Sequence, residues 1–213
     1  MKRGKYKLKR RAERQEETRL RIARAAVELH GTVGPSKTTM SALAEEAGVS
    51  RPTLYSHFPD ELSLFKACSS LDLSENPLPD PDPWAKIADP EERLRSALTE
   101  VYAYYLRREQ IMYNVLRDAQ GDAEVNANLR EVLKPLIAHW ERMKEILATA
   151  WEVNEERPQQ QQQQQLLLLL LLRGAIGVAL DFQTWRTMVR EQDLTDEQAI
   201  ELMVRMVRCV MRK

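Results

Sequence analysis

The stretch TTMSALAEEAGVSRPTLYSHF, residues 38–58, constrains the fold more than any other part of this chain of 213 residues. Two short apolar patterns of helical spacing lie on either side of Gly48, a residue suited to a turn that needs a positive φ. Thr39 precedes the first pattern, and Ser50 is a good N-cap for the second. Two short helices joined by such a tight turn predict a helix-turn-helix.

The second of these helices carries a polar face. Val49 and Leu54 are expected to point inward, which leaves a polar set of Arg51, Thr53, Tyr55, Ser56 and His57. A helix of this kind presents its N-terminal end to the major groove, where Arg and short polar side chains reach base edges and a Tyr hydroxyl reaches a phosphate. The alternative is a plain helical hairpin with a solvated face.

The charge is unevenly distributed, although the formal net charge of the chain is zero. Residues 1–70 hold 14 Lys/Arg and 8 Asp/Glu, a net of +6, whereas residues 71–213 hold 18 and 24, a net of −6. A basic first third favours an anionic partner for that part. Because eight Lys/Arg lie in the first fourteen residues, we expect a basic flexible arm over residues 1–16 that does not pack.

Helical spacing of apolar residues, only seven glycines and few β-branched runs predict an all-α chain. The pattern begins at about Glu17, is interrupted by the breakers around Pro35, and resumes as the two short helices. Asp60 can cap a further helix after them. We therefore place a small helical domain with the helix-turn-helix at residues 17–70.

Residues 76–83, NPLPDPDP, hold four prolines and cannot form a helix, so we expect a proline-rich linker over residues 71–89. A second helical domain is expected at residues 90–213, beginning where Asp89 can cap a helix. Its helices are predicted at about 90–109, 111–117, 123–155 and 160–190, with a last helix that follows the capping box of Thr195 and Gln198 and ends near Met211.

The stretch QQQQQQQLLLLLLL, residues 159–172, is a low-complexity run. Leucines in a row leave a helix no polar face, so we expect this run to be buried on several sides, in the core or between subunits. It is too short for a membrane span, which needs about 20 apolar residues, and Arg173 interrupts it. The alternative is a run that a helix simply tolerates.

The stretch from Thr38 to Glu61 closely resembles the DNA-binding domain of the tetracycline-repressor (TetR) family of bacterial transcription regulators. The family's pattern of paired Thr, "IA..AGVS" and "TLY.HF" corresponds here to Thr38–Thr39, Leu43–Ala44, Ala47–Ser50 and Thr53–Phe58. The resemblance covers residues 17–70, and beyond them it depends on the all-helical architecture alone. It implies a repressor that binds a palindromic operator in double-stranded DNA as a homodimer, with a C-terminal ligand-binding and dimerisation domain from which a small-molecule effector acts to release the DNA.

The resemblance also implies roles for individual residues in DNA binding. Thr39 lies where the family contacts a phosphate, and Arg51 lies where it reads bases. At the start of the next helix the family has a Lys that meets a phosphate, whereas Glu61 stands here and would repel DNA. Lys37, Lys66 or the basic arm could replace that contact, although the arm could equally be a solvated tail. The predicted DNA-binding residues are Lys37, Thr39, Ser50, Arg51, Pro52, Thr53, Tyr55, His57 and Lys66.

The second domain specifies its ligand poorly. Its aromatic residues and methionines could line an effector pocket, although such residues more often form plain core; they are Tyr102, Tyr105, Met112, Tyr113, Trp140 and Met143. The resemblance implies a dimer interface of the last two helices from each chain. Its candidates, each of which could equally be core within one subunit, are Phe182, Trp185, Met188, Val189, Met203, Met206, Val207 and Val210.

No catalytic site, metal or cofactor is expected. The chain has no Ser/His/Asp set, no glycine-rich phosphate loop and no metal-ligand spacing, and His139 has no second His four residues on. Cys68 and Cys209 are far apart and are expected to be thiols in a reducing cytosol. The basic start has no apolar stretch behind it, so we expect no secretory signal, no membrane partner, and a cytoplasmic, nucleoid-associated protein.

Two alternatives to a ligand-responsive regulator stay open. A non-specific DNA-binding helical protein would bind without sequence preference and with a steep dependence on salt. A helical enzyme with a basic tail would require a clustered acid/base pair in the second domain.

Overall fold

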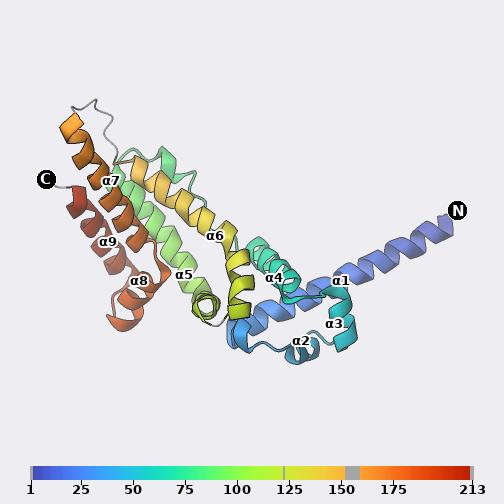
Figure 1. Cartoon of the computed structure of the whole chain (residues 1–213). Coiled ribbons are helices and arrows are strands. Elements are labelled where there is room, and N and C mark those ends of the chain that lie inside the picture. The colour runs from blue at the N-terminus through green and yellow to red at the C-terminus, as the bar shows by residue number, and fades with distance from the viewer. Residues whose placement is uncertain (1, 122, 152–158, 212–213) are drawn as a thin grey trace. The chain divides into compact units, whose positions relative to one another are not determined.

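The structure, a computed structural model, describes residues 2–121, 123–151 and 159–211, and every regular element in those ranges is a helix (Figure 1). The predicted all-α fold is therefore confirmed. The chain divides into two compact units. Unit 1 is Met1–Leu78 with Arg108–Lys134, and unit 2 is Pro79–Arg107 with Pro135–Lys213. This division groups residues 108–134 with the first part of the chain, a grouping that the sequence did not indicate.

Unit 1 is built around the helix-turn-helix. Its own helices are α1 (Lys2–Thr32), η1 (Pro35–Lys37), α2 (Met40–Glu46), α3 (Arg51–His57) and α4 (Glu61–Glu75). The end of α5 (Pro90–Gln120) and the start of α6 (Ala123–Thr149) complete the unit. The helices share one buried apolar core, which includes Ile22, Ala26, Leu43, Leu54, Phe58, Leu64, Phe65 and Leu129.

The basic arm is helical, which corrects the expectation of a flexible segment. α1 begins at Lys2 instead of near Glu17, although the side chains of residues 9–17 are all exposed, as expected for a segment that does not pack. Lys, Arg, Glu, Gln and Ala favour helix, and no proline interrupts them. The packed part of α1 therefore continues as helix into the basic segment.

Unit 2 is a bundle of the remaining helices. It contains η2 (Trp84–Lys86), the rest of α5 and α6, α7 (Gln159–Ala179), α8 (Phe182–Arg186), one π-helical turn η3 (Thr187–Glu191) and α9 (Asp196–Met211). Large side chains fill its centre, among them Trp84, Leu98, Tyr102, Tyr105, Met143, Leu147 and Trp185.

The predicted capping residues start the helices of unit 2. Asp89 accepts a hydrogen bond from the Glu92 N–H at 2.7 Å at the start of α5. At the start of α9 the Thr195 N–H donates to Gln198 Oε1 at 2.9 Å, and the Gln198 N–H donates to Thr195 Oγ1 at 3.2 Å. This reciprocal pair is the predicted capping box, and it is confirmed.

Three helices differ from their predicted extents. α5 runs without a break to Gln120, and the predicted helix over 160–190 ends at Ala179. Asp181 begins a new helix there, because its carboxylate accepts the Thr184 N–H at 2.7 Å. The helix predicted over 123–155 ends at Thr149, and its expected last residues, 152–155, lie outside the described residues.

Most of the leucine run is exposed within the single chain, so it is not buried in the core of one subunit, and its burial between subunits stays a prediction. Leu172 is buried, whereas Leu166, Leu167, Leu170 and Leu171 are 53–70 % exposed. Among the described residues no single helix is long and apolar enough to cross a membrane, and only the bent pair Gln163–Ala179 and Phe182–Glu191 meets that test jointly.

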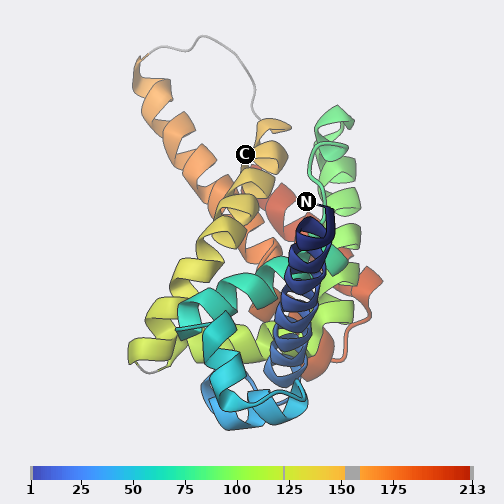
Figure 2. The same cartoon turned by 90° about the vertical axis from the view of Figure 1, so that its right-hand side faces the viewer.

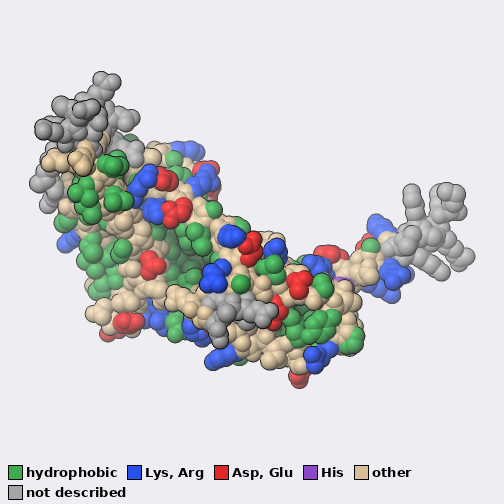
Figure 3. Space-filling model, viewed as in Figure 1, with side chains coloured by type: hydrophobic (Ala, Val, Ile, Leu, Met, Phe, Trp, Pro, Cys, Tyr) green, Lys and Arg blue, Asp and Glu red, His purple; other side chains and the backbone are tan. Residues whose placement is uncertain are grey.

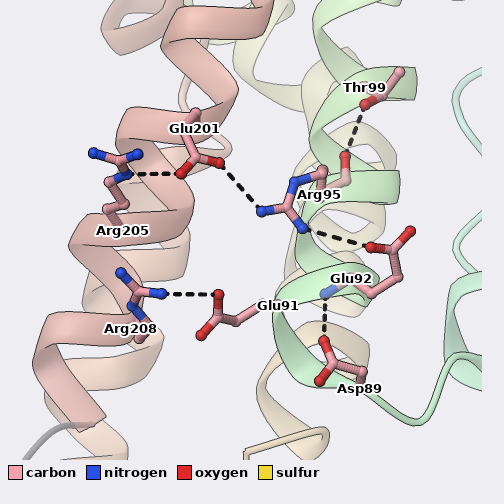
Figure 4. Close-up of polar contacts among 8 residues, drawn as sticks. All are labelled: Asp89, Glu91, Glu92, Arg95, Thr99, Glu201, Arg205 and Arg208. Atoms are coloured by element: carbon pink, nitrogen blue, oxygen red, sulfur yellow. Dashed lines mark hydrogen bonds and ion pairs between the residues drawn. The ribbon is translucent and has the colours of Figure 1, made fainter.

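Charged residues join α5 and α9 in unit 2 (Figure 4). Arg95 pairs with Glu201 at 3.2 Å, and Arg208 pairs with Glu91 at 3.3 Å. Pairs as exposed as these add little stability. They align one side of α9 with α5, while Ile200, Met203, Val204 and Val207 of α9 are buried.

Candidate nucleic-acid interface

The turn between α2 and α3 is tight because one glycine and one hydrogen bond close it. Gly48 has φ 61°, a conformation that side chains with a Cβ rarely adopt, and the Val49 N–H donates to the Ala44 carbonyl at 2.9 Å. Leu43 and Leu54 are fully buried and hold the two helices together. The helix-turn-helix predicted from these residues is confirmed.

Side-chain caps set the starts of both helices. Thr39 Oγ1 accepts from the Ala42 N–H at 3.1 Å at the start of α2. Ser50 Oγ accepts from the Thr53 N–H at 3.3 Å at the start of α3, and the two hydroxyls lie 2.8 Å apart. Both caps satisfy donors that a helix start leaves unpaired.

The outer surface of α3 is polar and open. Its side chains from Arg51 to His57 are exposed or half-buried except Leu54, and Tyr55 is 42 % exposed. Lys37 and Thr39, which lead into α2, are also exposed. The residues predicted to bind DNA on α3 therefore share one short helix and present an accessible surface.

Lys66 lies on a different helix from this group. It is exposed on α4, and it acts electrostatically on Glu131 of α6. The hydrogen bond from Lys134 is the main cause that lowers the pKa of Glu131, and the charge of Lys66 adds to it. Glu61, the departure from the family pattern, is half-buried in the first turn of α4.

Arg19 is a positioning residue that the sequence did not indicate. Its guanidinium donates to the His57 carbonyl at 2.8 Å and lies over the Phe58 ring, 4.2 Å from the centroid. The last residue of α3 is thereby held against α1. No local pattern distinguishes Arg19 from the other polar residues of α1, because its partners are 38 and 39 positions away.

A buried polar cluster holds the loop before α2. Asn114 of α5 donates from Nδ2 to the carbonyls of His30 and Gly31, at 3.1 and 3.0 Å. Asp118, one turn further on, accepts the Ser36 N–H at 2.9 Å. Gly34 has φ 96°, a conformation that residues with a Cβ rarely adopt, so another residue there would strain the loop.

The electrostatics of Asp118 match this role. Burial would raise the pKa of the Asp118 carboxyl, but the hydrogen bonds from Arg117 and Ser36 outweigh burial, and the pKa lies below its ordinary value. Asp118 is therefore a carboxylate at neutral pH and acts as an acceptor for the loop. In the sequence, the only sign of this cluster is that Asp118 follows Asn114 by four positions, which places both on one face of a helix.

The residues predicted to line an effector pocket are divided between the two units. Tyr102, Tyr105, Trp140 and Met143 belong to unit 2, whereas Met112 and Tyr113 belong to unit 1. The Tyr102 hydroxyl donates to the Ala179 carbonyl at 2.9 Å, and the Tyr105 hydroxyl donates to the Leu180 carbonyl. These two tyrosines bind the carbonyls at the end of α7, and burial raises their pKa values.

The residues predicted for a dimer interface divide into core and surface. Phe182, Trp185, Met188, Met203 and Val207 are buried within unit 2, Val189 and Val210 are half-buried, and Met206 is 49 % exposed. Further exposed apolar residues lie on α7 and α9, two helices in mutual contact. Figure 3 shows hydrophobic side chains gathered over these helices. We refer to the set of Leu167, Leu170, Leu171, Val178, Leu202 and Met206 as the α7–α9 face.

Across the residues that the structure describes, no group of three or more His, Cys, Asp or Glu could hold a metal ion. His139 Nε2 instead lies 2.9 Å from the Pro79 carbonyl.

A family model matches the first part of the chain. Residues 22–68 match the model of the tetR family of bacterial regulatory proteins. A search of curated proteins gives no match. The matched range contains the packed part of α1, the helix-turn-helix and the first half of α4.

Solved structures share the fold over most of the chain. A tetR-family transcriptional regulator from Streptomyces coelicolor is 19 % identical with a TM-score of 0.58, over 92 % of this chain and 80 % of that one. NalD, the secondary repressor of the MexAB-OprM multidrug efflux pump in Pseudomonas aeruginosa, is 21 % identical with a TM-score of 0.61, over 93 % and 97 %. A TetR-like transcriptional regulator from Rhodococcus is 22 % identical with a TM-score of 0.55, over 91 % and 93 %.

Proposed function

We propose that this chain, whose residues 22–68 carry the helix-turn-helix domain of the tetR family of bacterial regulatory proteins, is a transcription repressor that binds a palindromic operator as a homodimer and is released by a small-molecule effector. The observation that carries the proposal is the open polar surface of α3. Arg51 and Tyr55 are exposed on a helix that a tight turn and a Ser50 cap hold against α2. NalD, which shares the fold, is itself a repressor, and this favours repression over activation.

The bases and phosphates would be contacted from different parts of this surface. Arg51 begins α3, the end that enters the major groove, where its guanidinium can bind a guanine edge with two hydrogen bonds. Tyr55 is one turn further and can reach a phosphate. Lys37 and Thr39 lie at the start of α2, which suits a phosphate contact from beside the groove.

The α7–α9 face supports a homodimer. Its six apolar residues are at least 40 % exposed, and Gly174 between them on α7 is also exposed, with nothing within 4 Å of a Cβ placed there. Exposed apolar residues gathered on two helices that contact each other are typical of a protein interface. A second copy presents the same face, so two copies can bury it mutually around a two-fold axis.

α5 supports a route from effector to DNA. It is one continuous helix, with Pro90–Arg107 in unit 2 and its remaining turns in unit 1. There Asn114 and Asp118 hold the loop that leads to Lys37 and Thr39. An effector that binds more tightly to a state with a shifted α5 would lower the affinity for DNA. The decrease is limited by the difference between the effector's affinities for the two states.

The proposal is tested by selecting binders from a random duplex library with the purified full chain at two salt concentrations. We expect enrichment of one inverted repeat whose half-sites are centred about one helical turn apart, roughly 34–36 Å. Enrichment of no sequence, with binding lost as salt rises, would leave a non-specific DNA-binding protein and overturn the proposal.

A further inference from the structure

The part of α1 that extends beyond the packed domain is the strongest charged feature outside the helix-turn-helix. Packing of α1 begins at Ile22, which is fully buried, whereas every side chain from Lys9 to Glu17 is exposed. Residues 2–16 add about 22 Å of helix at 1.5 Å per residue. We refer to residues 2–16 as the α1 extension.

The α1 extension is unfavourable as an isolated helix. It carries eight Lys/Arg and two Glu, and no acidic residue lies in its first turn. Cations at a helix N-terminus oppose the helix dipole, and like charges along its faces repel one another. The ion pair of Lys9 with Glu13, 3.8 Å apart and exposed, offsets little of this.

A polyanion removes these penalties. Phosphates placed along the extension would neutralise the repelling cations and would lie at the positive end of the helix dipole. Apart from Gly4, the extension has only three apolar residues, Tyr6, Leu8 and Ala12. These are too few to form an apolar face that could enter a lipid surface. Charge complementarity therefore favours a nucleic-acid backbone.

The position of the extension indicates that the nucleic acid it would contact is the DNA bound by α3 of the same domain. Arg19 contacts the His57 carbonyl at the end of α3, so α1 touches the recognition helix just after the extension ends, and both belong to unit 1. In Figure 1 and Figure 2, α1 continues past α2 and α3 toward the N-terminus. At 3.4 Å per phosphate of one strand, about 22 Å of helix could pass roughly six phosphates.

We propose that the α1 extension is a second DNA-binding element that follows the phosphate backbone beside the groove occupied by α3 and that gains helical stability on binding. This inference rests on the proposed function, because α3 brings the extension to the DNA. It adds affinity without adding sequence preference, since phosphates carry no direct sequence information. It also replaces the phosphate contact that Glu61 removes from the start of α4.

The test compares two doubly substituted full-length chains on the selected operator duplex and on a scrambled duplex of equal length. Arg11→Gln with Arg14→Gln removes two charges from the extension, and Lys86→Gln with Arg107→Gln removes two exposed charges from unit 2 as a matched control. Because a bound homodimer loses four charges, we expect the first pair to reduce the slope of log K against log[salt] by up to about 3.6 on both duplexes, with an unchanged ratio of their affinities. The control pair is expected to leave the slope unchanged.

Hydrogen exchange of the unsubstituted chain gives a second readout. We expect the amides of residues 2–16 to exchange at least tenfold more slowly with operator duplex than without it. Equal slopes for the two variant pairs, or exchange that the duplex does not slow, would overturn the proposal. So would equal slowing by vesicles of anionic lipid.

The two proposals fail in distinguishable ways. If α3 does not read sequence, no duplex is preferred. The salt slopes of the two substituted chains can still be compared on any duplex, so the role of the extension is still tested. If the extension does not bind DNA, the operator is still preferred and the two slopes agree.

Discussion

Arg51 and His30 show how differently two polar residues of unit 1 are used. Arg51 is exposed directly after the Ser50 cap, on a helix whose other contacts are complete without it. His30 is buried at the end of α1, with its ring against Phe65 and its Nδ1 3.8 Å from Cys68 Sγ. The first side chain is available for a partner, whereas the second belongs to the core of the domain.

Arg51→Ala tests the assignment of base reading to α3. We expect a loss of about 1–3 kcal/mol on the operator and relaxed preference at one base pair of each half-site, because a bidentate contact to guanine would be lost. Affinities for duplexes with each base at that position measure this, with Arg107→Ala in unit 2 as the control. An equal loss on every duplex would show that Arg51 contacts a phosphate instead.

His30 makes the stability of unit 1 sensitive to acid. Burial lowers its pKa to about 4 from an ordinary 6.5, and the charge of Asp118 opposes this shift only in part. The neutral ring is therefore favoured in the folded chain, and the unfolded chain takes up the proton more readily. The contribution of the neutral His30 ring to the free energy of unfolding is complete above pH 6.5. It is lost as the pH falls from 6.5 toward 4, by at most about 1.4 kcal/mol per pH unit.

His30→Gln should remove that part of the pH dependence. Denaturant unfolding between pH 7 and pH 4.5 measures it, and the readout is the slope of the unfolding free energy with pH, whatever the absolute stability of the variant. His139→Gln in unit 2 serves as the control and should keep the slope of the unsubstituted chain. The same slope in the His30 variant would contradict the prediction.

At the scale of the elements, α5 is the helix that serves both units. Its N-terminal turns pair with α9, and its C-terminal turns hold the loop that precedes α2. Asn114, 2 % exposed, satisfies carbonyls that the end of α1 leaves without intrahelical partners. The loop before α2 therefore depends on a side chain more than eighty residues away.

Asn114→Ala should loosen this loop and destabilise unit 1 by about 1–3 kcal/mol, because buried carbonyls lose their donor. The amide of Ser36, which donates to Asp118 in the intact loop, should exchange faster with solvent. Gln120→Ala, at an exposed position of the same helix, is the control. Unchanged exchange at Ser36 and unchanged stability would show that the loop holds itself.

At the scale of the whole molecule, the α7–α9 face bears on whether two chains assemble into a homodimer. Leu202 and Met206 are 40 and 49 % exposed on α9, on a side that neither the core nor the ion pairs with α5 occupies. The exposed leucines of α7 lie next to it through the contact of α7 with α9. Burying these side chains between two copies would remove the largest described set of exposed apolar residues.

Leu202→Glu should convert a dimer into monomers and weaken binding to the palindrome, because a carboxylate would be buried in an apolar interface. Sedimentation equilibrium measures the mass, and Gln192→Glu, an exposed position before α9, adds the same charge as a control. The exposed thiol of Cys209 should react faster with maleimide in the monomeric variant. Cys68 is buried, and burial raises its pKa to about 12, so it should not interfere. A mass of two chains for the Leu202 variant would contradict the prediction.

The sequence by itself determined the features that depend on neighbours within a few positions. The Thr39 and Ser50 caps, the Gly48 turn and the capping box of Thr195 each involve groups no more than five residues apart, so local residue types were sufficient to predict them. The helix-turn-helix and its polar face followed from these signals.

Only the tertiary structure decided which distant residues meet. Arg19 reaches His57, Asn114 reaches the end of α1, and Tyr102 binds the end of α7, contacts that link positions 38 to 84 residues apart. The same holds for the leucine run: helical pattern predicts an apolar helix, but which of its faces is covered depends on how α7 packs against α9. Local spacing encodes the face of a helix, and the packing of the whole unit decides whether that face becomes core or surface.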